Sequence, residues 1–147
     1  MIRPSSILQF EKAYLAAIAV GIVNTVLSWG QVNAILESPA LKNAGLGTGT
    51  LITSAIIGIL VPLVLWYFIA RRASNVAKWI FVVLTALGLF GFLSSLANPM
   101  VPKGLMTIGG IIATVLQVYA AWLLFRADAV AWLESKGDAA DEPRVID

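Results

Sequence analysis

The sequence predicts an all-α polytopic membrane protein, a bundle of four antiparallel transmembrane helices. Of its 147 residues, 59% are hydrophobic and only 12% are charged, and the mean hydropathy is +0.88. These values lie far outside the range of soluble domains. Two apolar runs, residues 51–70 and 76–97, flank a polar turn that contains Arg71 and Arg72. Each run is long enough to cross the hydrocarbon core of a bilayer, so together they predict a transmembrane hairpin.

The first predicted span covers about residues 13–30. It follows a short lead-in in which Ile7, Leu8 and Phe10 are spaced to form a surface helix at the membrane interface. A cleaved signal peptide is the alternative interpretation, because Val32-Asn33-Ala34 resembles a signal-peptidase site. The apolar run is longer than a typical signal-peptide core, and this favours a retained helix.

The connection over residues 31–50 is rich in glycine and is expected to be an external loop with one turn of helix around residues 32–37. Its glycines do not form a phosphate-binding motif, because Thr50 stands where a G-x-G-x-x-G pattern needs glycine and no lysine follows. The second span then runs over residues 51–70 and contains Pro62, which removes one backbone hydrogen bond and tends to bend a helix.

The third span, residues 76–97, begins after Ser74 or Asn75, either of which can cap a helix, and ends before Pro99. The fourth span covers about residues 105–125. An amphipathic extension over 126–136 is expected to turn Trp132 and its apolar neighbours toward lipid headgroups. The predicted transmembrane domain therefore comprises residues 1–136, and the acidic residues 137–147 are expected to form a mobile tail.

The distribution of positive charge predicts that both termini are cytoplasmic. With four spans, one side of the membrane holds eight positive residues: Arg3, Lys12, Arg71, Arg72, Lys78, Arg126, Lys136 and Arg144. The other side holds two, Lys42 and Lys103. This bias indicates a bacterial-type inner membrane with the richer side inside. The predicted interface anchors lie on that same side: Arg71, Arg72, Lys78, Trp66, Trp79, Trp122 and Trp132.

The side-chain inventory argues against an enzyme. The chain has no cysteine and no histidine, so it lacks the usual thiol nucleophile, general base and metal ligands. No Asp, Glu, Lys or Arg lies in the middle of a predicted span, and Glu11 is too shallow for the embedded carboxylate of a small four-helix drug exporter. We therefore expect no catalytic residue, no metal site and no cofactor, and the scattered positive charge does not indicate nucleic-acid binding.

The embedded polar residues that stand out are Asn24 and Gln117. Lipid cannot satisfy a carboxamide, so each is expected to face the bundle interior or a subunit contact, or to line a polar path. Small residues recur at four-residue spacing in the spans and predict faces for close helix approach. The glycines assigned to these helix-packing faces are Gly21, Gly58, Gly91 and Gly109.

Two runs at the predicted cytoplasmic edge, Asn75-Val76-Ala77-Lys78-Trp79 and Leu124-Phe125-Arg126-x-Asp128-Ala129-x-x-Trp132, resemble small, largely uncharacterised four-helix inner-membrane proteins of bacteria. The resemblance implies an inner-membrane setting and no activity.

The main functional hypothesis is a non-enzymatic accessory or scaffold subunit, whose partners are the bilayer and other membrane subunits or further copies of itself. The alternative is a homo-oligomeric channel for a small solute. Binding of a lipid or a quinone between the helices stays open.

Overall fold

The computed structural model describes residues 3–99 and 103–135, and within these ranges it contains helices and no strands. Four helices are long and apolar enough to cross a membrane: α1 (Ser5–Leu27), α4 (Thr48–Arg72), α5 (Asn75–Ala97) and α6 (Leu105–Leu123). Three shorter helices complete the described part of the chain: α2 (Trp29–Leu36), α3 (Pro39–Asn43) and α7 (Ala127–Glu134). The chain is therefore an all-α polytopic bundle.

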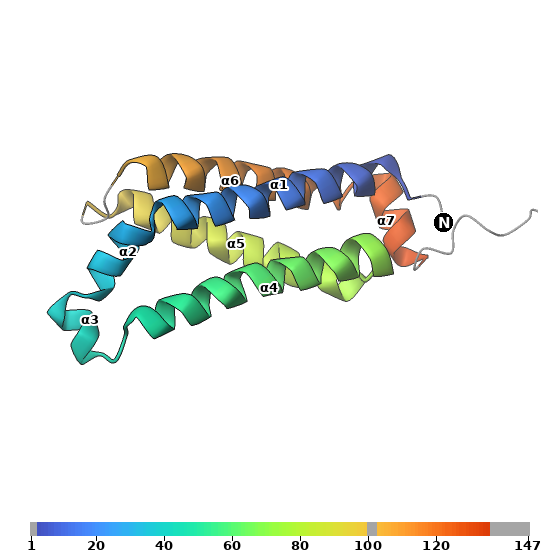
Figure 1. Cartoon of the computed structure of the whole chain (residues 1–147). Coiled ribbons are helices and arrows are strands. Elements are labelled where there is room, and N and C mark those ends of the chain that lie inside the picture. Colours follow the sequence, from blue (N-terminus) through green and yellow to red (C-terminus); the bar gives the residue numbers. More distant parts are fainter. Residues whose placement is uncertain (1–2, 100–102, 136–147) are drawn as a thin grey trace, which may run out of the picture.

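The bundle is closed at one end and spread at the other (Figure 1). Helices α1 and α6 run antiparallel and stay together along their length, whereas α4 diverges from α1 with increasing distance from α7. We call the closed end, where α7 and the α4–α5 turn lie, the α7 end, and the opposite end the α3 end. The chain connects α1 to α4 at the α3 end through α2 and α3, so this connector lies across the widest part of the molecule (Figure 1).

Helix α1 begins earlier than the sequence predicted. The carbonyl of Pro4 accepts hydrogen bonds from the amides of Ile7, at 3.1 Å, and Leu8, at 3.2 Å, so the helix starts at Ser5. The expected lead-in is thus the first part of α1. Ile7 and Phe10 are 0% exposed, and they pack inside the bundle because their helix continues directly into the span.

The connector differs from the expected loop, since residues 28–47 contain α2 and α3. Pro39 occupies the first position of α3, where its fixed φ angle and missing amide suit a helix start. The Thr48 hydroxyl donates to Asn33 Oδ1 at 3.1 Å and joins α2 to the beginning of α4.

The turn between α4 and α5 is two residues long. Ala73 adopts a left-handed conformation with φ 47°, and its burial to 3% exposure keeps the two helices close. The Ser74 hydroxyl accepts a hydrogen bond from the Ala77 amide at 3.2 Å, so Ser74 is the cap of α5.

Helix α7 is a separate element and not the expected continuation of the fourth span. Arg126 is extended, with φ −69° and ψ 147°, and this breaks the helix after α6. The chain then folds back across the α7 end, where Trp132 is 6% and Leu133 is 2% exposed. The expectation that these side chains face lipid headgroups is wrong, because they pack on the end of the bundle.

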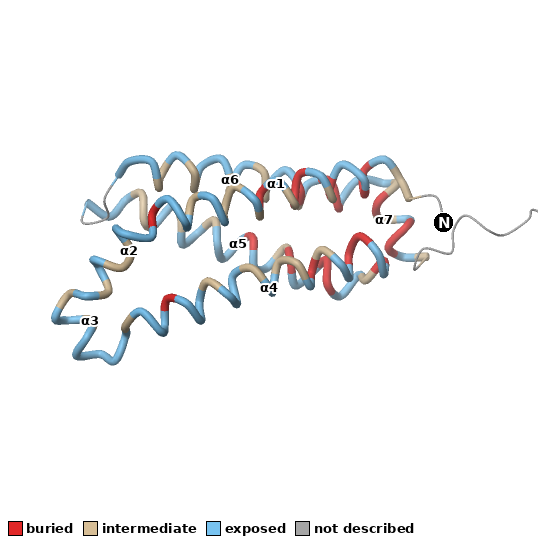
Figure 2. Tube along the Cα trace, viewed as in Figure 1, coloured by how far each residue is buried: buried red, intermediate tan, exposed pale blue. Residues whose placement is uncertain are grey.

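The buried core lies at the α7 end (Figure 2). Its centre is a cluster of three rings: the Tyr14 centroid lies 5.4 Å from that of Phe10 and 4.7 Å from that of Phe81, and the Phe10 and Phe81 centroids are 5.7 Å apart. Phe10 and Tyr14 are stacked, whereas Phe81 meets both rings edge-on, and contacts of both kinds add to the stabilisation from burial alone. The closed end is therefore a packed core, while the α3 half has few buried residues.

Candidate functional site

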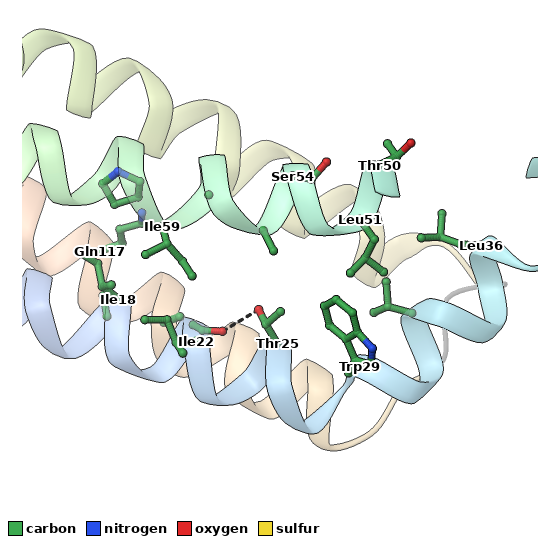
Figure 3. Close-up of a pocket in the computed structure, with 17 residues that line it drawn as sticks. Ile18, Ile22, Thr25, Trp29, Leu36, Thr50, Leu51, Ser54, Ile59 and Gln117 are labelled. Carbon is green, nitrogen blue, oxygen red and sulfur yellow. Dashed lines mark hydrogen bonds between the residues drawn. The ribbon is translucent and has the colours of Figure 1, made fainter. Parts of the chain in front are cut away.

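A cavity of about 580 Å³ lies between α1, α2, α4 and α6 in the spread half of the bundle (Figure 3). Gln117 of α6 lies at one end of it, close to Ile18 and Ile59, while Trp29 and Leu36 lie at the other end. The cavity follows from the divergence of α4 from α1, which leaves their facing surfaces without mutual contacts. Its volume lies within the usual range of small-molecule sites.

Two of the small-residue faces line this cavity. Ala17 and Gly21 come from α1, and Ser54 and Gly58 come from α4. A Cβ atom added at Gly21 or Gly58 would meet no atom within 4 Å. These glycines therefore leave open space between the helices and do not bring two backbones into contact.

The cavity wall offers several hydrogen-bonding groups and no charge. Among the described residues the Gln117 carboxamide has no hydrogen-bond partner. The Thr25 hydroxyl donates to the Gly21 carbonyl at 2.8 Å and keeps its capacity to accept. Pro62 has no amide hydrogen to donate to the carbonyl of Gly58, four residues earlier on the same helix. None of the described residues that line this cavity carries a formal charge.

Asn24 lies outside this cavity and joins α1 to α6. Its Nδ2 donates to the backbone carbonyl of Met106 at 3.2 Å. A Cβ atom at Gly109 would overlap the Asn24 carboxamide, so the glycine makes room for this side chain. The structure therefore brings Asn24 and Gly109 together and separates both from Gln117.

A second close approach was missed by the sequence reasoning. A Cβ atom at Gly110 would lie 2.7 Å from Phe92 Cε2, so this glycine lets the α5 ring lie against α6. The adjacent pair Gly109-Gly110 was the available signal. Gly91, which the sequence assigned to a packing face, is exposed on α5, and an added Cβ there would meet nothing within 4 Å.

The predicted interface anchors gather at the α7 end, most of them as pairs of a cation and an aromatic ring. The Arg71 guanidinium lies 5.6 Å from the Trp66 ring centroid, and that of Arg72 lies 6.0 Å from the Tyr67 centroid. The same arrangement on α6 places Arg126 5.7 Å from the Trp122 centroid. Such pairs keep the charge beside a ring that is itself suited to the membrane interface.

Lys78 differs from the other anchors because it is only 6% exposed. Its ammonium lies 4.5 Å from the Phe125 ring centroid and 5.5 Å from that of Trp79. Its stem is thus covered by the bundle and its charge lies against two rings. Trp132, the last of the predicted anchors, packs on the α7 end as described above.

Two carboxylates hold the α7 end together through partners that sequence reasoning did not identify. Glu11 accepts from Arg3 at 2.6 Å and from Arg71 at 3.2 Å, and so links α1 to the residues that precede it and to the last turn of α4. Asp128 of α7 accepts from the hydroxyl of Ser6, at 2.7 Å, and from its amide, at 3.1 Å. The hydroxyl hydrogen bond is the main cause that lowers the pKa of Asp128 below its ordinary value.

The described residues contain no group of three or more His, Cys, Asp or Glu side chains arranged to hold a metal ion. Comparisons of the chain with models of protein families, with curated proteins and with solved structures found no match. The argument for a function therefore depends on the geometry of this chain.

Proposed function

We propose that this protein is a non-enzymatic accessory or scaffold subunit of a membrane assembly that acts through contacts between its outward helix faces and the helices of a partner. The observation that carries the proposal is the unpacked glycine surface of α5, formed by Gly88 and Gly91. Both are exposed in the middle of a span, and neither has an atom within 4 Å of an added Cβ.

A glycine inside a helix costs about 1 kcal/mol relative to alanine, and contact with lipid does not offset this cost. Close packing of two transmembrane helices can offset it, because small residues let two backbones approach closely. Within this chain the Gly88 and Gly91 surface packs on nothing, and only 11% of the α5 span is buried. A partner helix on this surface supplies the contact that offsets the cost.

We further propose that the protein lies in a bacterial-type inner membrane with the α7 end in the cytoplasm. The support is the concentration of Arg71, Arg72 and Arg126 with their aromatic neighbours at that end, while Lys42 and Lys103 are at the α3 end. This asymmetry follows the positive-inside rule.

The experiment that tests the subunit proposal is extraction of the full chain in native nanodiscs, followed by its mass and the identity of whatever accompanies it. We expect a foreign membrane subunit at a fixed stoichiometry. It should be lost from Gly91→Leu and retained by Ala86→Leu, which introduces the same side chain at another exposed position of α5. A partner retained equally by both variants would contradict the assignment of this surface.

A pure homo-oligomer would instead favour the channel hypothesis. Of the two carboxamides predicted for a polar path, Gln117 lines the cavity together with the hydroxyls of Thr25 and Ser54, whereas Asn24 donates to the Met106 carbonyl of α6. In that case flux of small neutral solutes through liposomes, compared between the wild type and Gln117→Leu, is the deciding measurement.

A further inference from the structure

The size of the cavity between α1 and α4 matches a small molecule better than a helix from a partner. A spanning helix needs about 20 residues, whereas the lining of the cavity on α1 extends only from Ala17 to Thr25. Pockets of about 300–1,000 Å³ are instead typical of small ligands.

The lining determines that the ligand is neutral and mostly apolar. Ile18, Ile22, Leu51 and Ile59 provide apolar walls, and no described lining residue carries a charge. A carboxylate or a phosphate placed among these side chains would have no counter-charge at the depth of the membrane, which is strongly unfavourable. Fatty acids and phospholipid headgroups are therefore poor occupants.

The polar groups of the wall further select a ligand that donates a hydrogen bond. The Gly58 carbonyl receives no hydrogen from Pro62, and the Thr25 oxygen has already used its hydrogen on Gly21. Both are left as acceptors. Gln117 is the one lining carboxamide, and it can accept as well as donate. The wall also offers donors, from the Trp29 indole, the Thr50 and Ser54 hydroxyls and the Gln117 amide group. A hydroxyl group both donates and accepts, so it fits this wall better than a ketone or an ether oxygen, which can only accept.

From the size, the absence of charge on the described lining residues and the presence of both acceptors and donors in the wall, we propose that the cavity between α1 and α4 binds one neutral apolar alcohol. Its hydroxyl lies at the Gln117 end and its hydrocarbon body extends toward Trp29 and Leu36 (Figure 3). This site is separate from the glycine surface of α5, so the binding of the alcohol and the association with a partner subunit are independent properties.

The test uses the full chain in phosphatidylcholine nanodiscs and a long-chain alcohol that carries a diazirine in its hydrocarbon part. Light converts the bound probe into an adduct that mass spectrometry locates. Competition with the unlabelled alcohol measures its affinity. We expect saturable adducts on the cavity-facing residues of α1 and α4. The methyl ether and the carboxylic acid of the same chain length should compete less well than the alcohol.

Two variants test the wall directly. Gly58→Leu places a side chain in open space, so it fills the cavity without a clash and should weaken binding at least tenfold. Gln117→Leu removes the hydrogen bond that Gln117 offers and should weaken binding about threefold, which corresponds to the typical 0.6 kcal/mol of such a bond in a membrane. In Gln117→Leu the preference for the alcohol over the ether should also shrink. Ala86→Leu is the control, because it introduces the same side chain at an exposed position of α5 outside the cavity.

The proposal would be overturned by adducts spread evenly over the lipid-facing surface, by labelling that the unlabelled alcohol does not compete, or by equal affinity for the alcohol, the ether and the acid. Binding that Gly58→Leu leaves intact would also refute it. If Gly58→Leu fails to fold, Gly21→Leu replaces it, because the open space around Gly21 lies in the same cavity.

Discussion

The contact between Asn24 and Gly109 makes a prediction whose sign follows directly from geometry. Asn24 donates to the Met106 carbonyl at 3.2 Å, and an alanine at Gly109 would place its methyl group on the Asn24 carboxamide. Gly109→Ala should therefore displace the amide and separate α1 from α6. Asn24→Ala removes the two atoms that clash most and leaves its Cβ 3.0 Å from the added methyl group, so the second substitution should rescue most of the effect of the first.

The expected magnitudes can be worked out from the same contacts. Asn24→Ala loses one interhelical hydrogen bond, about 0.6 kcal/mol and at most about 1.7 kcal/mol. Gly109→Ala gains about 1 kcal/mol of helix propensity but adds an overpacking cost of about 1–3 kcal/mol. The double variant keeps the propensity gain and loses most of the overpacking, because only the Cβ at position 24 still lies close to the added methyl group. It should therefore exceed the additive expectation for its free energy of unfolding by about 1–3 kcal/mol.

The assay is reversible unfolding by titration with SDS in mixed micelles. It compares the wild type, Asn24→Ala, Gly109→Ala and the double variant. Gly91→Ala is the matched control, because its added methyl meets no atom within 4 Å, and it should be neutral or stabilise by up to about 1 kcal/mol. Additivity within about 0.5 kcal/mol would refute the reasoning, since independent sites add to that precision.

Three further predictions concern the α7 end and the orientation. Asp128→Ala should lower the free energy of unfolding by about 1 kcal/mol because the Ser6 amide at the start of α1 loses its cap. The pKa of Asp128 is lower in the folded than in the unfolded protein, so in the wild type this stabilisation is present at neutral pH. It should fade in SDS titrations carried out below about pH 4. Glu11→Gln should lower the melting temperature and remove most of its dependence on salt, because one carboxylate then no longer pairs with arginines from two elements; an unchanged salt dependence would contradict this. In intact cells an impermeant thiol reagent should label Ala44→Cys and not Ser74→Cys, and the reverse pattern would invert the proposed topology.

The transmembrane helices were predictable because each one appears in the sequence as an apolar run of sufficient length. Apolar runs long enough for a bilayer gave all four spans, and the structure has a long apolar helix at each. The boundaries moved where tertiary contacts extend a helix beyond its apolar run. Helix α1 reaches back to Ser5 because Ile7 and Phe10 are buried in the core, and hydropathy alone does not reveal that packing. Helix α7 separates from α6 for a similar reason, since Trp132 and Leu133 find a place on the end of the bundle.

The candidate site was predictable only in part. Four-residue spacing identifies smooth helix faces, but it does not say what lies opposite them. Gly109 faces Asn24 across a close contact, whereas Gly21 and Gly58 face the cavity. The difference arises from the path of α4, which is determined by the α2–α3 connector and by the core at the other end. Both depend on contacts between residues far apart in the chain, and a single sequence does not record such contacts.

The two halves of the bundle therefore serve different physical purposes. At the α7 end the aromatic cluster, the Glu11 ion pairs and the Asp128 cap join α1, α4, α5 and α7, so this end can carry the stability of the fold. At the α3 end α1 is fastened to α6 through Asn24, while α4 is tied only to the connector through Thr48 and Asn33 among the described polar contacts. The packed core lies at the α7 end, so the proposed ligand space between α4 and α1 lies outside it, beside the folded connector of α2 and α3.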